Sequence, residues 1–167
     1  MLINLEGTVL CRTKGEDLVE RAGCLDTFET GSTVKNIYYF RPGYAQFIAD
    51  VIGNKRARFA FYSSKERKNI EPIVQYIQEK TGLNGDMMHI FDQSHTTKMT
   101  DKAEFQFMVG ANEWNRYRDL EKVWADPWCE GRFSARNTLL IESDETKVQM
   151  NLGNSLIPSE FTKEHVE

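Results

Sequence analysis

Four short apolar runs, separated by stretches with helical spacing, limit most strongly how this chain can fold. The runs cover residues 1–5, 58–62, 88–91 and 138–141, and each has the length of a strand. Around residues 44–52 and 70–77, apolar side chains recur at spacings of three and four, which indicates helices. Strands that alternate with helices are typical of a parallel sheet with crossover helices, so we predict an α/β fold.

The ends of the expected helices carry the residues that helix ends prefer. Pro42 suits the first turn of a helix, where its missing N–H costs nothing. Gly82 suits a left-handed cap after a second helix, which we predict over residues 65–80. A third, short helix is expected over residues 120–124. Residues from about 11 to 36 are polar, rich in glycine and weakly periodic, and this predicts a flap inserted after the first strand.

Length and composition predict one domain. The chain has 167 residues, of which 40% are hydrophobic, enough for one core and too few for two ordinary domains. We expect the domain to cover residues 1–158, flap included, and residues 159–167 to form a C-terminal tail.

Charge and cysteine usage narrow the classes of function. A net charge of -4 argues against nucleic acid as the main partner, because binding to phosphate backbones needs clustered Lys and Arg. Three widely spaced cysteines without a CxxC pair make a disulfide scaffold or a structural zinc site an unfavoured interpretation. No apolar run reaches the roughly 20 residues that span a bilayer, and few residues precede the first strand. We therefore expect an intracellular protein without a membrane span.

Several segments, in order, resemble the motifs of the RNA polymerase II C-terminal-domain phosphatases, also called the NLI-interacting-factor-like family. Together they extend over nearly the whole chain. The resemblance implies a haloacid-dehalogenase-like, three-layer α/β fold with a central, mostly parallel sheet. The matching segments are Asn4-Leu5-Glu6-Gly7-Thr8 for the Asp-x-Asp-Gly-Thr signature, Arg41-Pro42-Gly43, Phe59-Ala60-Phe61-Tyr62-Ser63, Tyr117-Arg118-Asp119-Leu120, Leu139-Leu140-Ile141-Glu142-Ser143-Asp144, and Asn154-Ser155-Leu156-Ile157-Pro158.

The resemblance also implies a chemistry that this sequence departs from. In the family, the first Asp of the signature attacks phosphorus and the second protonates the leaving oxygen. Here these positions hold Asn4 and Glu6, and an amide has no anionic oxygen for the attack. The fourth motif carries Glu142 and Ser143 where the family has Asp-Asp or Asp-Asn, and Arg118 stands for Lys.

The same departures weaken the expected metal site. The family holds Mg2+ through the first Asp, the backbone carbonyl of the second, and an Asp of the fourth motif. Asn4 is neutral, while Glu6 and Glu142 are each one methylene too long for a cation that demands strict octahedral geometry. We therefore expect no cofactor and no metal. If a metal binds, its ligands are expected to be Glu6, Glu142 and Asp144.

Two motif residues keep the ability to bind an anion. The Ser63 hydroxyl can donate to a phosphoryl oxygen, and the Arg118 guanidinium is suited to phosphate or carboxylate. We predict a catalytically degenerate pseudophosphatase that acts as a protein-binding module or subunit of a larger complex. Its partner is expected to be a protein, docking an acidic or phosphorylated peptide near these residues and the flap. The alternative is an active, Mg-dependent phosphoprotein phosphatase with an altered site built from Glu6, Glu142 and Asp144.

Simpler structural roles remain open for the same residues. Ser63 can cap the following helix, and Arg118 can pair on the surface with Glu113 or Glu121. Asn4 can bond the neighbouring loop backbone. Glu142 and Asp144 can be solvated side chains. The three tryptophans, Trp114, Trp124 and Trp128, are expected to pack around the short helix.

Overall fold

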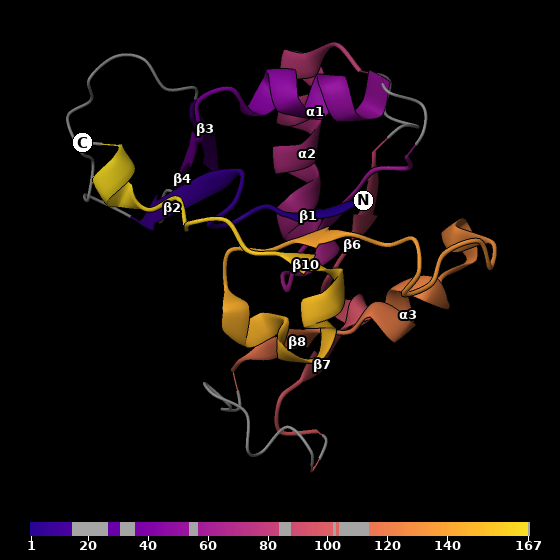
Figure 1. The fold of residues 1–167 in the computed structure, drawn as a ribbon. Helices are drawn as coiled ribbons and strands as arrows, with labels where there is room; N and C mark the ends of the chain where they lie inside the picture. Colours follow the sequence, from indigo (N-terminus) through magenta and orange to yellow (C-terminus); the bar gives the residue numbers. More distant parts are fainter. Residues whose placement is uncertain are drawn as a thin grey trace.

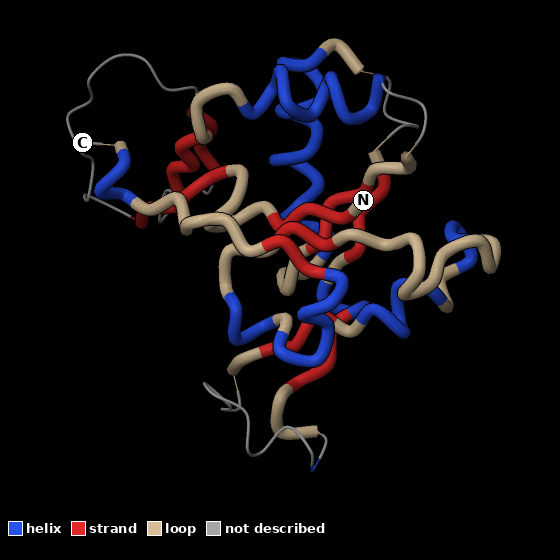
Figure 2. Tube along the Cα trace, in the orientation of Figure 1, coloured by secondary structure: helices blue, strands red, loops and turns tan. Residues whose placement is uncertain are grey.

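A parallel five-stranded sheet forms the centre of the molecule (Figures 1 and 2). The structure is a computed structural model that describes residues 1–14, 27–30, 36–53, 57–83, 88–101, 103 and 114–166. The strand order is β10-β9-β1-β5-β6, and every neighbouring pair is parallel. The strands are β1 (Leu2–Asn4), β5 (Ala60–Tyr62), β6 (His89–Phe91), β9 (Leu140–Ile141) and β10 (Ser155–Leu156).

Both faces of the sheet are covered, which makes three layers (Figure 1). Successive side chains of a strand point to opposite faces. Ile3 and Phe61 therefore join a core with α1 (Tyr44–Gly53) and α2 (Arg67–Thr81). Leu2 and Phe91 join a second core on the other face, with α3 (Leu120–Trp124) and the 3-10 turn η4 (Pro127–Cys129). The predicted α/β class and three-layer arrangement are confirmed.

The flap contains an antiparallel sheet that the sequence did not predict. Its strands, in the order β2-β4-β3, are β2 (Leu10–Lys14), β4 (Asn36–Phe40) and β3 (Thr27–Thr30). The pairing ends at Phe40, opposite Leu10, so residues 38–40 belong to the flap sheet, and α1 begins at Tyr44 after a short turn. Residues 15–26 and 31–35 of the predicted flap lie outside the described residues.

Residues 159–166, which the sequence predicts as a tail, pack against the flap. The side chains of Phe161 and Val166 are buried with Cys11, Ile37 and Tyr39. The Phe161 N–H donates to the Gly7 carbonyl at 2.6 Å, and the 3-10 turn η7 (Lys163–His165) follows. Two apolar residues thus fix this segment against the flap, where Figure 1 shows it next to β2.

Most helix boundaries agree with the predicted ones. Gly82 has φ of 66° and its N–H donates to Gln78, so the predicted left-handed cap is confirmed, as is the helix over residues 120–124. However, α2 begins at Arg67 with Glu66 as its N-cap residue, two residues later than predicted. Ser63 does not cap it; its hydroxyl accepts from the Lys65 N–H at 3.2 Å, in a turn before the helix.

Within the described part of the chain, no helix has both the length and the apolar character that crossing a membrane requires. The thiols of Cys11 and Cys129 are free and buried, and burial raises the pKa of Cys11 to about 11. Cys24 lies outside the described residues.

Candidate functional site

The carboxyl ends of three adjacent strands bring the predicted site residues together. Asn4 is the last residue of β1, Ser63 directly follows β5, and Glu142 directly follows β9. The register pairs Ile3 with Ile141 and Asn4 with Tyr62, so these three residues lie at one edge of the sheet. In open parallel sheets this edge is where ligands bind.

Arg118 enters the same place from a separate two-stranded sheet, and it is buried. It ends β8 (Arg116–Arg118), which pairs antiparallel with β7 (Thr96–Lys98). Its Nε donates to Glu142 Oε2 at 2.7 Å, and its Nη2 donates to Asn4 Oδ1 at 2.8 Å. The guanidinium also lies over the Tyr62 ring, 5.1 Å from its centroid. With 1% of Arg118 and none of Glu142 exposed, the interpretations of a surface ion pair and of a solvated Glu142 are wrong.

Asn4 closes the network because its amide has both a donor and an acceptor. While Oδ1 accepts from Arg118, Nδ2 donates to Glu142 Oε1 at 2.8 Å and to the Glu6 carbonyl. The opposite amide orientation would place NH2 against the guanidinium, donor against donor. Arg118, Asn4 and Glu142, which we call the buried triad, therefore form a ring with one positive and one negative charge.

The triad uses the oxygens that would hold Mg2+ in the family. Asn4 Oδ1 accepts from a cation, the Glu6 carbonyl accepts from the Asn4 amide, and both Glu142 oxygens accept from the triad. Glu142 Oε1 also accepts from the Asp144 N–H at 3.2 Å. A hard cation needs unengaged oxygens in octahedral array. As arranged here, these residues do not fit Mg2+, because a guanidinium already supplies the positive charge.

The carboxylate of Glu6 lies outside the triad, at the entrance of the site. It contacts Lys65 Nζ at 2.6 Å and Arg12 Nε at 3.1 Å. Burial lowers the pKa of Lys65, and the adjacent Glu6 carboxylate partly offsets this. In place of a free acid, the second signature position thus holds a carboxylate fixed between two cations.

Asp144 is also used locally. Its Oδ1 accepts from the Thr146 N–H and hydroxyl, at 3.0 and 2.6 Å, and caps the 3-10 turn η5 (Glu145–Lys147). Its Oδ2 lies 2.9 Å from Lys147 Nζ. To act as a metal ligand, as the sequence allowed, Asp144 would therefore have to give up these contacts.

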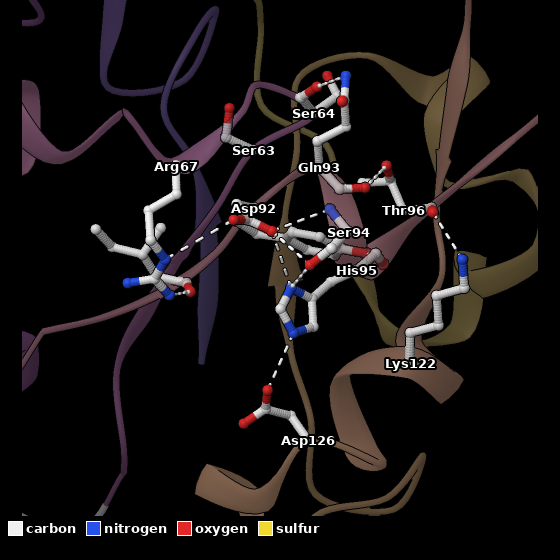
Figure 3. A network of polar contacts seen from close by, with 12 residues as sticks. Ser63, Ser64, Arg67, Asp92, Gln93, Ser94, His95, Thr96, Lys122 and Asp126 are labelled. Atoms are coloured by element: carbon white, nitrogen blue, oxygen red, sulfur yellow. Dashed lines mark hydrogen bonds and ion pairs between the residues drawn. The ribbon is translucent and has the colours of Figure 1, made fainter. Parts of the chain in front are cut away.

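Hydrogen bonds hold Ser63 and the two residues after it beside the polar network of Figure 3. The Ser63 N–H donates to the Phe91 carbonyl at 2.9 Å. Gln93 holds the next two residues, because its side-chain amide donates to the Ser64 carbonyl at 3.1 Å and its backbone N–H donates to the Lys65 carbonyl at 2.9 Å. The network continues through the 3-10 turn η2 (Gln93–His95) to His95, whose Nε2 lies 3.0 Å from Asp126 Oδ2. Ser63 itself is 6% exposed.

The three tryptophans do not share one environment. Trp124 and Trp128 pack against the core beside α3, as predicted. Trp114 is 82% exposed, so the packing prediction is wrong for this residue.

Two site features were missed by sequence reasoning. The first is the pair Arg12 and Lys65, which hold Glu6. The second is a groove of about 450 Å³ between the flap and the first turns of α2, which we call the basic groove. Among the described residues, the charged ones that line it are all cations: Arg12, Lys65 and Lys68. Lys65, two residues after the second motif, could have indicated this groove from the sequence. Arg12 could not, because the pairing of the flap strands places it there.

The parallel sheet with the motif residues at its carboxyl edge agrees with the haloacid-dehalogenase-like fold that the sequence resemblance implies. The family described as NLI interacting factor-like phosphatase matches residues 1–166, and the chain belongs to this family.

Solved structures agree with the fold. Two structures of Fcp1, an RNA polymerase II CTD phosphatase, match at 12% identity with TM-scores of 0.60 and 0.61. The first is a fission yeast variant bound to beryllium fluoride. The match covers 96% of this chain and 41% of each of those chains. No curated protein sequence matches the chain.

Proposed function

We propose that this protein is a pseudophosphatase that binds an acidic or phosphorylated peptide of a partner protein. The observation that carries the proposal is the buried triad. Nucleophilic attack needs an anionic oxygen, and the position of the nucleophile holds an amide whose two ends are both hydrogen-bonded. The network that replaces the nucleophile is buried and electrically balanced. Its one free group among the described residues, Arg118 Nη1, is a donor and cannot attack phosphorus.

The triad also changes which cations are available to an anionic ligand. Arg118 has its charge balanced by Glu142 at 2.7 Å and is 1% exposed. We therefore assign its predicted anion-binding role to the basic groove, which Arg12, Lys65 and Lys68 line. Lys68 also pairs with the exposed Glu66 at 2.7 Å, a surface contact that a ligand can replace.

A ligand of the basic groove must bind Arg12 and Lys65 more strongly than the Glu6 carboxylate does. That carboxylate already contacts Arg12 and Lys65, so an anionic peptide competes with it for both. A phosphate carries up to two charges and three acceptor oxygens, against one charge for a carboxylate. Charge-assisted hydrogen bonds are the stronger ones, which favours the phosphorylated ligand over the acidic one.

The experiment that tests this function measures binding and turnover on the same sample. The probes are two fluorescein-labelled degenerate peptide libraries, one with a central phosphoserine and one with serine. We expect the phosphoserine library to bind more tightly and to release no phosphate with Mg2+ present. Lys65→Gln and Lys68→Gln should each weaken binding by up to about tenfold, whereas Lys80→Gln, on α2 like Lys68 but outside the groove, should not.

Two results would overturn the proposal. Phosphate release above that of a blank, lost in Glu6→Gln, would establish the alternative of an active phosphatase. Equal binding of the two libraries, unchanged by both groove substitutions, would place any partner elsewhere.

A further inference from the structure

A second groove, apolar where the first is basic, lies at the outer edge of the central sheet. It has a volume of about 340 Å³, and we call it the sheet-edge groove. Its floor is a row of side chains from three neighbouring strands. The register pairs Ile3 with Ile141 and Ile141 with Leu156, so all three point to the face that α1 covers.

The cover of this row is incomplete. Ile3 and Ile141 are buried, but Leu156, on the edge strand β10, is 54% exposed. Across the groove, Phe47 of α1 is 42% exposed. Parallel sheets are normally covered on both faces, because their strands are apolar on both. The groove is therefore a gap in the helical layer, with a large apolar side chain on each side.

The positive charge of Arg41 in the groove favours an anionic group on the ligand. Of the described residues that line the groove, Arg41 is the one that is charged. Where the chain is described, its guanidinium contacts neutral groups only. Arg41 Nη2 donates to the carbonyls of Gly7 and Ser159, and Arg41 Cζ lies 5.3 Å from the centroid of the Phe161 ring. Within the described part of the chain no carboxylate balances this charge, and Arg41 Nε lacks a hydrogen-bond partner.

A second lining residue has an unused polar atom. Thr8 is 6% exposed, and its Oγ1 has no partner among the described residues. Buried polar atoms are usually hydrogen-bonded, and each that is not calls for an explanation. A carboxylate accepts from both a guanidinium and a hydroxyl.

We propose that the sheet-edge groove binds a partner peptide in which a large apolar side chain stands next to a carboxylate. The apolar side chain lies between Phe47 and Leu156, and the carboxylate lies toward Arg41. This site is independent of the basic groove, whose charged residues are on the flap, in the turn before α2 and on α2. It completes the helical layer over β10 in the way that a covering helix would.

The first test uses a small probe with this chemistry, followed by amide chemical shifts. The probe is 4-phenylbutyrate, and 4-phenylbutanol has the same shape without the charge. We expect 4-phenylbutyrate to shift saturably the amides of residues 44–47 and 155–157, and to bind at least fivefold more tightly than the alcohol. Phe47→Ser and Leu156→Ser should each weaken it about tenfold. Both side chains are half exposed, so these variants should fold.

Leu152→Ser is the matched control, because Leu152 is 51% exposed but does not line the groove. Equal binding of acid and alcohol, or loss of binding in the control alone, would refute the proposal.

The second test selects the peptide. Random 12-residue peptides displayed on phage are selected on the 167-residue chain and counter-selected on Phe47→Ser/Leu156→Ser. Enrichment of an apolar residue next to Asp or Glu supports the proposal, and enrichment of basic peptides overturns it. Self-association that the double variant abolishes would also overturn it, since a second copy would then fill the groove.

Discussion

Removing the guanidinium of the buried triad should destabilise the fold far more than removing an exposed cation. In Arg118→Met, the carboxylate of Glu142, with no exposed surface, loses its 2.7 Å partner. Breaking a buried ion pair from one side costs about 3–5 kcal/mol, because it leaves an uncompensated charge. This is a large share of the roughly 5–15 kcal/mol that stabilises a domain.

A second substitution separates this charge effect from lost packing. Glu142→Gln in the Arg118→Met background removes the stranded charge and keeps an oxygen for the Asn4 amide and the Asp144 N–H. We expect the loss of unfolding free energy in the double variant to be about 3 kcal/mol smaller than the sum of the losses in the two single variants. Lys147→Met, which removes a partly exposed partner of Asp144, should cost under about 1 kcal/mol.

Urea unfolding, followed by far-UV circular dichroism, measures these differences. With a slope of about 2 kcal/mol/M, Arg118→Met should lower the midpoint by roughly 2 M. Additive single and double variants would refute the reasoning, since they would mean that the two side chains do not interact in the folded state. If Arg118→Met does not fold at all, recovery of folding in the double variant still decides the question.

Four further results are expected. Asn4→Asp should not restore hydrolysis of an aryl phosphate and should lower stability, because it places a second carboxylate against Glu142; normal turnover would contradict this. Millimolar Mg2+ should leave the melting temperature unchanged within error, since a weak ligand adds little stability. Gly7→Ala should destabilise by about 2 kcal/mol in urea unfolding, because Gly7 has φ of 79° and a Cβ would collide with the Ser143 hydroxyl. Burial lowers the pKa of His89 below its usual 6.5, so the folded state binds fewer protons, and stability should fall as pH drops below that value; His89→Gln should flatten this slope.

The fold could be predicted from the sequence because its determinants are local. Apolar runs of strand length and helical spacing give the sheet and helices, and glycine at position 82 marks a helix end. The strands are shorter than predicted, because β-ladder pairing covers only part of each apolar run. The edge strand β10 and the flap strands were missed: β10 has two residues, and the flap lacks clear alternation.

The arrangement of the site could be predicted only in part. The parallel sheet places Asn4, Ser63 and Glu142 at one edge, and the structure brings them there. The direction of the Arg118 side chain could not be derived, because its partners are distant in sequence: Asn4 is 114 residues away and Glu142 is 24 residues away. An arginine beside acidic neighbours in sequence suggested a surface pair, whereas β7 and β8 carry it into the interior.

The buried triad explains why the departures from the family motifs occur together. A guanidinium at position 118 reaches two acceptors, and it finds them in the longer carboxylate of Glu142 and in the amide oxygen of Asn4. An aspartate at position 4 would add a second negative charge next to Glu142 and could not donate to it, so the amide is the residue that fits both neighbours. Each substitution is thus compensated by the other two. Reverting Asn4 to Asp would leave a buried negative charge unmatched. Reverting Arg118 to Lys or Glu142 to Asp would keep the charge but remove the fork or the reach that the hydrogen bonds of the network use, which supports the proposed loss of phosphoryl transfer.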